Sequence, residues 1–273
     1  MKKIAKITTQ KRTKDRYNIF LTNGDKEEYA FSVDEAVLVE FNLRKGLELE
    51  DSVIEMLLEK DSIQKSYTLA IHFLSYRMRT KKEMREYLVK KEVVPEHISV
   101  ILNRLIKEKL LDDKLFSEMF VRTRMNTSSK GPLLIKRELV EKGVTSAIAD
   151  EAIYLYPYEV QFDKVSKLLE KKISVGKRES RKQQIQKLQV NLLQKGFSQA
   201  VISDAISQMD VEKDTETEWN AIVYQGDKLV RKYSKKYEGF MLQQKIKEAL
   251  YRKGFQVEYI NRFLDECLEE NSY

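Results

Sequence analysis

The sequence predicts a mainly α-helical protein made of tandem three-helix, helix-turn-helix-like repeats in an elongated array, preceded by a small unit that contains a β-hairpin. Two observations predict the repeats. A six-residue phrase occurs four times, and the steps between its copies are 51, 53 and 58 residues, which is room for about three helices of roughly 11–12 residues each. A third observation sets the N-terminus apart, because residues 1–31 carry β-favouring runs and a turn signal.

The repeated phrase is predicted to end one helix of each repeat. It reads Leu-Val-Lys-Lys-Glu-Val at 88–93, Leu-Val-Glu-Lys-Gly-Val at 139–144, Leu-Leu-Gln-Lys-Gly-Phe at 192–197 and Leu-Tyr-Arg-Lys-Gly-Phe at 250–255. Glycine fits the position after a helix, where a left-handed backbone is needed, and the preceding Lys complements the helix dipole. Glu92 stands where the other copies have glycine, so we expect the first stop to be looser or differently shaped.

The N-terminal residues are predicted to form a small antiparallel sheet. β-Favouring runs at 3–8, 16–21 and 27–31 are separated by turn residues, and Asn23-Gly24 is typical of a tight hairpin turn. Ser32 is then expected to cap a helix that runs from about Asp34 to Leu43 and stops at Lys45-Gly46.

Helices are predicted for the rest of the chain in order. A helix at about 50–60 is followed by one at 66–78, and Thr80 with Glu83 forms a capping box for the next. A third helix at about 96–109 completes the first repeat. The second repeat has a loop at 128–132, with Pro132 in a first helical turn, and the third and fourth repeats run at about 160–207 and 217–268.

These elements give five predicted domains. They are an α+β unit at 1–62 and repeats at 63–113, 114–158, 159–209 and 210–273.

Composition favours an anionic partner and excludes several classes of protein. The net charge is +7 and the pI is about 9.1, values that suit nucleic-acid binding. A single cysteine, Cys267, excludes an internal disulfide, and two histidines, His72 and His97, leave no Cys/His metal site. No apolar run is long enough to span a bilayer, so we expect a cytoplasmic protein with no membrane partner.

No catalytic constellation stands out in the sequence. Asp112-Asp113 could be proposed as ligands for a divalent metal, but no further carboxylate or histidine supports them, and capping of a helix is the better explanation. Glycine-rich loops that bind nucleotide phosphates are also missing from the sequence. We therefore expect a protein that is not an enzyme and needs no cofactor or metal.

Positive charge gathers at three places, each near the junction of the first two helices of a repeat. Such groups favour contact with phosphates or an acidic protein face, although each could also be an ordinary solvated surface. The candidate nucleic-acid or filament-binding residues are Arg77, Arg79 and Lys82 in the first repeat, Arg122, Arg124, Lys130, Lys136 and Arg137 in the second, and Lys171, Lys172, Lys177, Arg178, Arg181, Lys182 and Lys187 in the third.

Several of these segments resemble motifs of the RecX family, which regulates the RecA recombinase in bacteria. The motifs are Leu-Ser-Tyr-Arg-Met-Arg-Thr-Lys-Lys-Glu-Met at 74–84, Leu-Leu-Asp-Asp-Lys-Leu-Phe at 110–116, Arg-Thr-Arg at 122–124, Lys-Gly-Pro at 130–132 and Glu-Leu-Val-Glu-Lys-Gly-Val at 138–144. The resemblance covers essentially the whole chain and is similar to the long Gram-positive type. Glu92 and Ser117 depart from the family pattern.

The resemblance implies a monomer whose repeats bend into a curved array and lie in the groove of a RecA filament on single-stranded DNA. Such a protein modulates filament growth, ATP hydrolysis and strand exchange, mostly by inhibition, in recombination, repair and the SOS response. RecA, its nucleoprotein filament and single-stranded DNA would be the partners, with double-stranded DNA as a further one.

Two other functions fit the same sequence features. One is a helix-turn-helix regulator that reads double-stranded DNA, although no symmetric dimerisation element is apparent. The other is a helical scaffold that does not bind DNA and whose basic faces only keep it in solution.

Overall fold

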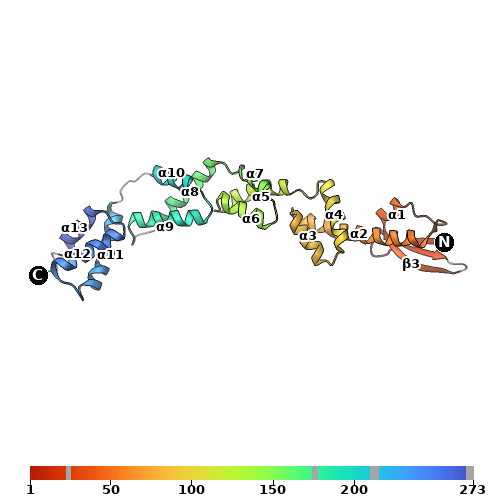
Figure 1. The fold of residues 1–273 in the computed structure, drawn as a ribbon, viewed down its shortest axis with the longest axis horizontal. Coiled ribbons are helices and arrows are strands. Elements are labelled where there is room, and N and C mark those ends of the chain that lie inside the picture. Colours follow the sequence, from red (N-terminus) through yellow and green to blue (C-terminus); the bar gives the residue numbers. More distant parts are fainter. Residues whose placement is uncertain (23–25, 174–177, 210–214, 269–273) are drawn as a thin grey trace. The chain divides into compact units, whose positions relative to one another are not determined.

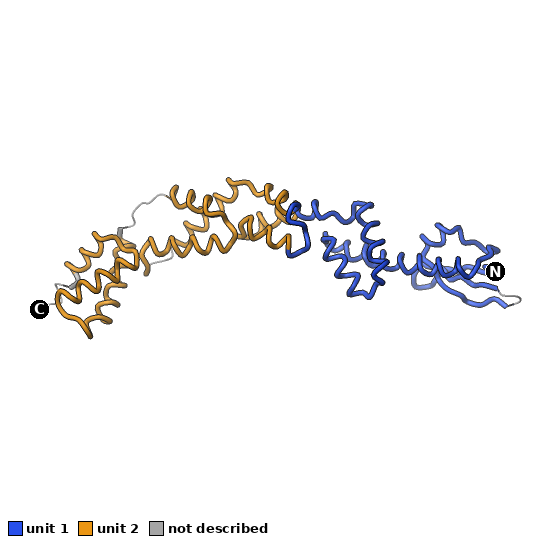
Figure 2. Tube along the Cα trace, viewed as in Figure 1, with its two compact units in different colours: residues 1–117, 141–148 blue, residues 118–140, 149–273 orange. Residues whose placement is uncertain are grey.

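The computed structural model describes residues 1–22, 26–173, 178–209 and 215–268, and these residues form four strands and thirteen helices (Figure 1). A small β-containing unit comes first and three-helix repeats follow it, so the predicted mainly α-helical fold of three-helix repeats is confirmed. The Cα positions cluster into two compact units, residues 1–117 with 141–148 and residues 118–140 with 149–273 (Figure 2).

An antiparallel sheet with strand order β3-β2-β1-β4 forms the N-terminus. Its strands are β1 Lys2–Thr9, β2 Arg16–Thr22, β3 Glu27–Asp34 and β4 Glu48–Leu49. β2 and β3 pair as the predicted hairpin, and the Asn23-Gly24-Asp25 turn lies outside the described residues. The short strand β4 was not predicted, because two residues carry no alternation pattern.

The first helix, α1 (Glu35–Glu40), is capped by a different residue from the one predicted. Ser32 stays in the strand ladder opposite Asn18, and the Asp34 side chain accepts a hydrogen bond from Ala36 N at 3.0 Å. The helix also ends before Lys45-Gly46, because Asn42 takes the left-handed backbone (φ 46°) that closes it. The predicted start near Asp34 is confirmed, but the predicted capping residue and the predicted stop were wrong.

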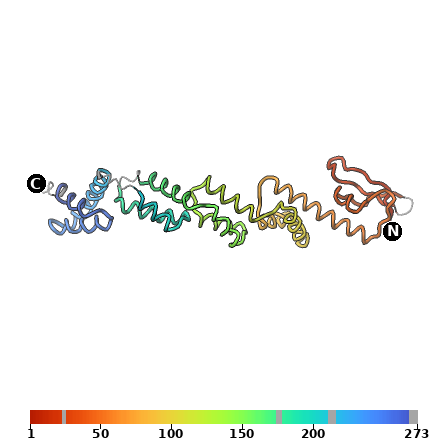
Figure 3. Tube along the Cα trace, turned by 90° about the horizontal axis from the view of Figure 1, so that it is seen from above, coloured from red at the N-terminus to blue at the C-terminus, as the bar shows by residue number. Residues whose placement is uncertain are grey.

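A single helix, α2 (Asp51–Tyr76), replaces the two helices predicted at 50–60 and 66–78. Figures 1 and 3 show it as one unbroken helix that runs from the sheet into the first repeat. No Gly or Pro interrupts this segment, so nothing stops the helix once it has started. The predicted boundary between residues 62 and 63 falls inside it, and the domain bounds stay predictions.

Asp61, in the middle of α2, ties the helix to the sheet. Its carboxylate is 2.9 Å from Arg16 Nη2 and accepts a hydrogen bond from Asp34 N at 2.8 Å. Lys65 Nζ lies 2.9 Å away on the next turn. Burial works to raise the pKa of this carboxyl, but the hydrogen bonds from Arg16, Lys65 and the Asp34 amide outweigh it and lower the pKa.

Each repeat contains three helices, and the helices of the first and fourth repeats each surround an apolar core of their own. The first repeat uses the second half of α2 with α3 (Lys81–Lys90) and α4 (Pro95–Lys107); the second has α5 (Asp113–Thr127), α6 (Pro132–Glu141) and α7 (Ser146–Ile153); the third has α8 (Tyr158–Ile173), α9 (Arg181–Gln194) and α10 (Gln199–Gln208); the fourth has α11 (Thr215–Tyr233), α12 (Gly239–Arg252) and α13 (Val257–Leu268). The leucines of the repeated phrase, Leu88, Leu139, Leu192 and Leu250, are all buried.

The repeated phrase ends the second helix of every repeat, as predicted. Gly143, Gly196 and Gly254 all have a left-handed backbone with φ near +85° to +90°. Glu92 takes the same conformation (φ 58°), and Val93 N donates to Leu88 O at 3.1 Å, just as Phe197 N donates to Leu192 O at 3.2 Å. The expectation of a differently shaped first stop was therefore wrong.

Candidate nucleic-acid interface and the joints between repeats

The cations predicted in the first repeat lie between the end of α2 and the first turn of α3, where they contact other parts of the protein. Arg77 pairs with Glu83 at 3.1 Å. The Arg79 guanidinium lies 3.9 Å from the centre of the Phe73 ring. Lys82 Nζ donates to Glu141 O at 3.0 Å. The cations therefore lie at the junction of the first two helices of the repeat, as predicted. Each of these side chains also helps to hold the fold together.

Most cations predicted in the second repeat are paired with carboxylates. Lys130 contacts Glu138, and Arg124 Nε lies 3.1 Å from the other oxygen of that carboxylate without good hydrogen-bond geometry. Lys136 Nζ is 2.5 Å from Asp150. The remaining two candidates, Arg122 and Arg137, are exposed and form no hydrogen bond or ion pair with other described residues.

Some of the cations predicted in the third repeat likewise contact other groups of the protein, and others are exposed. Arg178 covers the Tyr224 ring at 5.0 Å, and Lys187 pairs with Glu179 at 2.5 Å. The backbone N–H of Arg181 donates to Glu218. Lys171, Lys172 and Lys182 are exposed side chains at the end of α8 and the start of α9. Lys177 lies outside the described residues.

A second feature, which the sequence reasoning missed, connects successive repeats. We call it a joint: the N-terminus of the second helix of one repeat meets the Lys-Gly stop of the second helix of the next. In the first joint the buried Thr80 hydroxyl donates to Lys142 O at 2.7 Å. A Cβ added to Gly143 would lie 2.3 Å from Lys82 Cβ. Glycine therefore serves the close approach as well as the turn.

The second joint uses backbone donors in place of a hydroxyl. Gly131 N donates to Lys195 O at 2.7 Å, and Leu133 N donates to Gly196 O at 3.1 Å. A Cβ on Gly131 would lie 2.5 Å from the Gly196 carbonyl, and one on Gly196 would lie 2.4 Å from Leu134 N. The Lys-Gly-Pro motif at 130–132 is thus explained by a contact between two backbones that leaves no room for a side chain.

The third joint repeats the arrangement of the first. Ser180 caps α9, and its hydroxyl also donates to Lys253 O. A Cβ on Gly254 would lie 3.0 Å from the Ser180 hydroxyl and 3.2 Å from Lys182 Cβ, so this joint is less tight than the other two.

The joints explain why Glu92 can replace glycine in the first repeat. Its stop is exposed, because the β-containing unit precedes it and no earlier repeat within the described residues docks on it. The left-handed turn is kept, but the close approach is not required. Only the first of the four copies of the phrase lacks the glycine. This difference was the sequence signal that could have revealed the joints.

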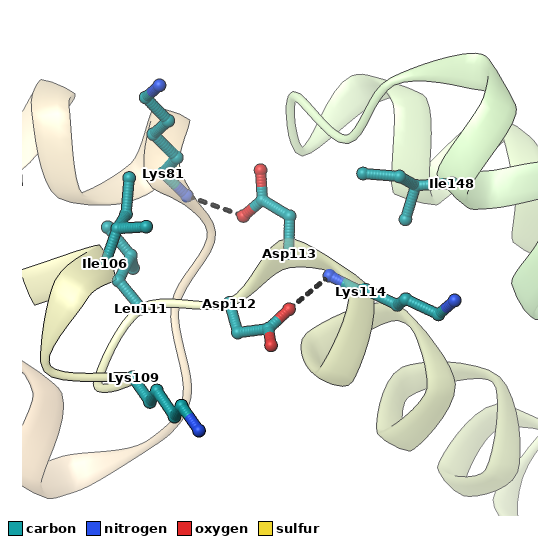
Figure 4. A pocket seen from close by; sticks show the side chains of 8 residues that line it. All are labelled: Lys81, Ile106, Lys109, Leu111, Asp112, Asp113, Lys114 and Ile148. Atoms are coloured by element: carbon teal, nitrogen blue, oxygen red, sulfur yellow. Dashed lines mark hydrogen bonds between the residues drawn. The ribbon is translucent and has the colours of Figure 1, made fainter. Parts of the chain in front are cut away.

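An acidic side chain from the first helix of the following repeat completes two of the joints. Asp113 accepts a hydrogen bond from Lys81 N at 2.8 Å, and Glu218 accepts one from Arg181 N at 3.0 Å. Figure 4 shows Asp113 reaching to the start of α3 while Asp112 turns back to its own helix. Asp112 accepts from Lys114 N and Leu115 N, which confirms the predicted helix cap.

Glu83 carries the strongest electrostatic contact of the first joint. Besides its capping box with Thr80, its carboxylate accepts hydrogen bonds from Arg77 and, at 3.0 Å, from Lys142 Nζ. Burial works to raise the pKa of Glu83, but these hydrogen bonds outweigh it and lower the pKa to about 2. The carboxylate is therefore charged at neutral pH and holds cations from both repeats.

Other kinds of site have little support in the described residues. A cavity of about 340 Å³ beside the first joint has both acidic and basic residues and two isoleucines in its wall (Figure 4). In the part of the chain that the structure describes, no group of three His, Cys, Asp or Glu residues could hold a metal ion. Nor is any described helix both long and apolar enough to cross a membrane.

Models of known protein families match almost the whole chain. The RecX N-terminal domain matches residues 2–50, the first three-helix domain of RecX matches 67–105, and the second matches 112–153. The third three-helix domain matches twice, at 159–206 and 216–264. This double match agrees with the second helices, which have 14 residues in each of the last two repeats and 10 in the first two.

Relatives and solved structures agree with these matches. Regulatory protein RecX of Oceanobacillus iheyensis is 54% identical over 271 residues, covering 99% of this chain and 100% of its own length. The protein of the same name from Halalkalibacterium halodurans is 43% identical, covering 96% and 99%.

A crystal structure of regulatory protein RecX is 35% identical and covers 76% of this chain and 100% of its own, with a TM-score of 0.69. A RecX structure from Lactobacillus salivarius is 39% identical, covers 56% and 99%, and has a TM-score of 0.54. On family models, full-length relatives and solved structures alike, the chain belongs to the RecX family of regulatory proteins, which are not enzymes.

Proposed function

We propose that this protein binds RecA and RecA filaments on single-stranded DNA and modulates them, mostly by inhibition. Filament growth, ATP hydrolysis and strand exchange would be the regulated steps. The observation that carries the proposal is membership of the RecX family over the full length of the chain. The protein would act as a monomer in the cytoplasm, where RecA and DNA are found.

The basic surfaces beside the joints are the proposed contact area. In the third repeat this area includes Lys172 near the end of α8 and Lys182 near the start of α9, which are both exposed. Such cations can contact DNA phosphates or an acidic face of RecA without reading sequence. Exposed cations without an internal contact would bind directly, and paired ones such as Lys130 and Lys136 would mainly hold the surface in place.

The rate of ATP hydrolysis by RecA on single-stranded DNA tests the proposal. The protein is added after filaments have formed, at amounts well below that of RecA. We expect hydrolysis to fall progressively, because loss or capping of filaments removes active subunits. An unchanged rate with folded protein and RecA from a matched species would contradict the proposal, and a footprint at one defined duplex site would favour a sequence-specific regulator.

A further inference from the structure

A basic pocket lies in the fourth repeat, and none of the residues that line it is among those proposed above. Its volume is about 300 Å³, and it is formed by the second half of α11 and the C-terminal end of α12. The residues that line it are Gln225, Lys228, Leu229, Lys232, Tyr233, Ala249, Arg252 and Lys253. We call it the repeat-four pocket.

Four of the eight residues in this pocket are cations, and none is an acid. Lys228, Lys232 and Arg252 are exposed, and within the described residues neither they nor Lys253 form an ion pair. Other cations of the same repeat are paired, for example Arg262 with Glu266 at 2.7 Å. Like charges held together repel one another, so a bound anion would be favoured here.

The ends of the two helices explain only part of this charge. Cations in the last turn of a helix complement its dipole, which accounts for Lys232 on α11 and Arg252 on α12. Lys228 lies more than a turn before the end of α11, where the dipole effect has decayed. Its presence in the same pocket needs another reason.

Aromatic and apolar groups stand beside the cations. Leu229 and Ala249 are 7% and 6% exposed and form an apolar floor. The half-buried Tyr233 ring is 5.4 Å from Lys232 Nζ and meets Tyr237 edge to face at 6.3 Å. Grooves that bind single strands combine cations for the backbone with aromatic faces for the bases.

The pocket adjoins the basic residues of the third joint. Gln225 Nε2 donates to Arg178 O at 2.6 Å, and Arg178 covers Tyr224, a ring that is 43% exposed. On the other side, Lys253 is followed by Gly254, which packs against Lys182. Cations therefore continue from the third repeat into the pocket.

We propose that the repeat-four pocket binds the sugar–phosphate backbone of a single strand of nucleic acid, with Lys228, Lys232, Arg252 and Lys253 as the phosphate contacts. The half-buried Tyr233 ring in the pocket and the exposed Tyr224 ring beside it favour a single strand over a duplex, since duplex bases are already stacked on one another. The proposal deepens the proposed function and rests on its DNA-binding part, and it does not require contact between the pocket and RecA.

Fluorescence anisotropy of a labelled oligo(dT) strand with the full-length protein, without RecA, tests the pocket. We expect Lys228→Gln with Arg252→Gln to weaken binding at least tenfold at low salt. The slope of log K against log salt should decrease by about 1.4, because each lost phosphate contact on a single strand accounts for about 0.7. Circular dichroism checks that the variant is folded.

Arg231→Gln with Lys247→Gln is the matched control, because it removes the same charge from exposed positions of the same two helices outside the pocket. Equal losses in the two variants would overturn the proposal and leave net charge as the cause. It would also be overturned if the pocket variant bound oligo(dT) normally but lost binding to polyglutamate, which would assign the pocket to an acidic protein. In either case, continued inhibition of RecA by the wild type would leave the proposed function intact.

Discussion

Single glycines decide how closely successive repeats approach. Gly196 has a left-handed backbone (φ 88°), and an added Cβ would lie 2.4 Å from the Leu134 amide nitrogen. Gly239 is also left-handed (φ 50°), but nothing lies within 4 Å of the position of its Cβ. The two positions share the backbone constraint and differ in the space around them.

Alanine at these two positions separates the two effects. We expect Gly196→Ala to lower the free energy of unfolding by about 3 kcal/mol, from left-handed strain and from the clash in the second joint. Gly239→Ala should cost only about 1 kcal/mol, since it carries the strain alone. Urea unfolding followed by circular dichroism measures both. Equal losses would show that the backbone of the joint can move apart without cost.

Sequence could predict the helix stops but not their contacts. Glycine after Lys at a fixed step indicates a left-handed stop whether or not anything packs on it, so periodicity alone could not reveal the joint. The prediction of a differently shaped stop at Glu92 was wrong for the same reason. A non-glycine residue can adopt the left-handed backbone at a modest cost when no other group lies close to its Cβ. The tolerance of position 92 is set by its neighbours in space, which the sequence does not show.

At the scale of elements, the helix termini are the connections between repeats. Helix starts have unpaired N–H groups and helix ends have unpaired carbonyls, and the joints pair these groups directly or through hydroxyls such as that of Thr80. The dipoles of successive second helices then meet positive end to negative end. Glu83 strengthens the first joint by binding Arg77 and Lys142 together.

The depressed pKa of Glu83 predicts a specific dependence of stability on pH. Its pKa is about 2 in the folded protein and 4.5 in a free side chain. The ionised carboxylate therefore stabilises the fold above pH 4.5, and this contribution, of order 3 kcal/mol, is lost as the pH falls towards 2. Glu83→Gln should reduce the free energy of unfolding at pH 7 and match the wild type near pH 2.

Urea unfolding of both proteins between pH 2 and pH 7 measures this difference. If the two proteins differed in their free energy of unfolding by the same amount at every pH, the prediction would be contradicted and packing would be the cause. Lys245 pairs with Glu248 on the surface of α12, so Glu248→Gln is a control with an exposed ion pair, which should change stability little at any pH.

Local patterns predicted some elements better than others, for physical reasons. The capping box at Thr80, the cap at Asp112 and the hairpin of β2 and β3 depend on nearby residues, and all three were found. The single helix α2 was predicted as two helices, and Asp61, which lies between the two predicted segments, is buried although Asp is usually exposed. Its true partner, Arg16, lies 45 residues earlier in the sequence, and no local pattern could connect the two.

At the scale of the whole molecule, a net charge of +7 is distributed over cations with two different tasks. Many predicted binding residues are engaged inside the fold, including Arg77, Arg79 and Lys136. Others, such as Lys172 and Lys182, are exposed beside the third joint. Sequence could locate the basic clusters but could not separate these two groups, because pairing depends on which carboxylates the fold brings near.

The two groups should respond differently to neutralisation. Lys172→Gln with Lys182→Gln should weaken binding to single-stranded DNA and lower the salt slope by about 1.4, because two direct phosphate contacts are lost. Anisotropy titrations over a range of salt concentrations measure this change. Lys130→Gln with Lys136→Gln should leave the slope nearly unchanged and instead lower the urea midpoint, since these residues pair with Glu138 and Asp150.

Lys11→Gln with Arg12→Gln provides the control for net charge, because both residues are exposed in the turn before β2. A loss of affinity as large as that of the Lys172 and Lys182 variant would show that the total charge, not its position, governs binding.

The joints also determine at which end of the series of repeats a further repeat could be added. A repeat added before the first would have to pack its helix start against Glu92, whose side chain occupies the space that glycine leaves free in the other stops. A repeat added after the fourth would meet the start of α12, where Glu238 forms no side-chain cap and nothing lies within 4 Å of the Cβ position of Gly239. Duplication of the gene segment for the last repeat could therefore lengthen such a protein at its C-terminal end without redesign of any existing contact.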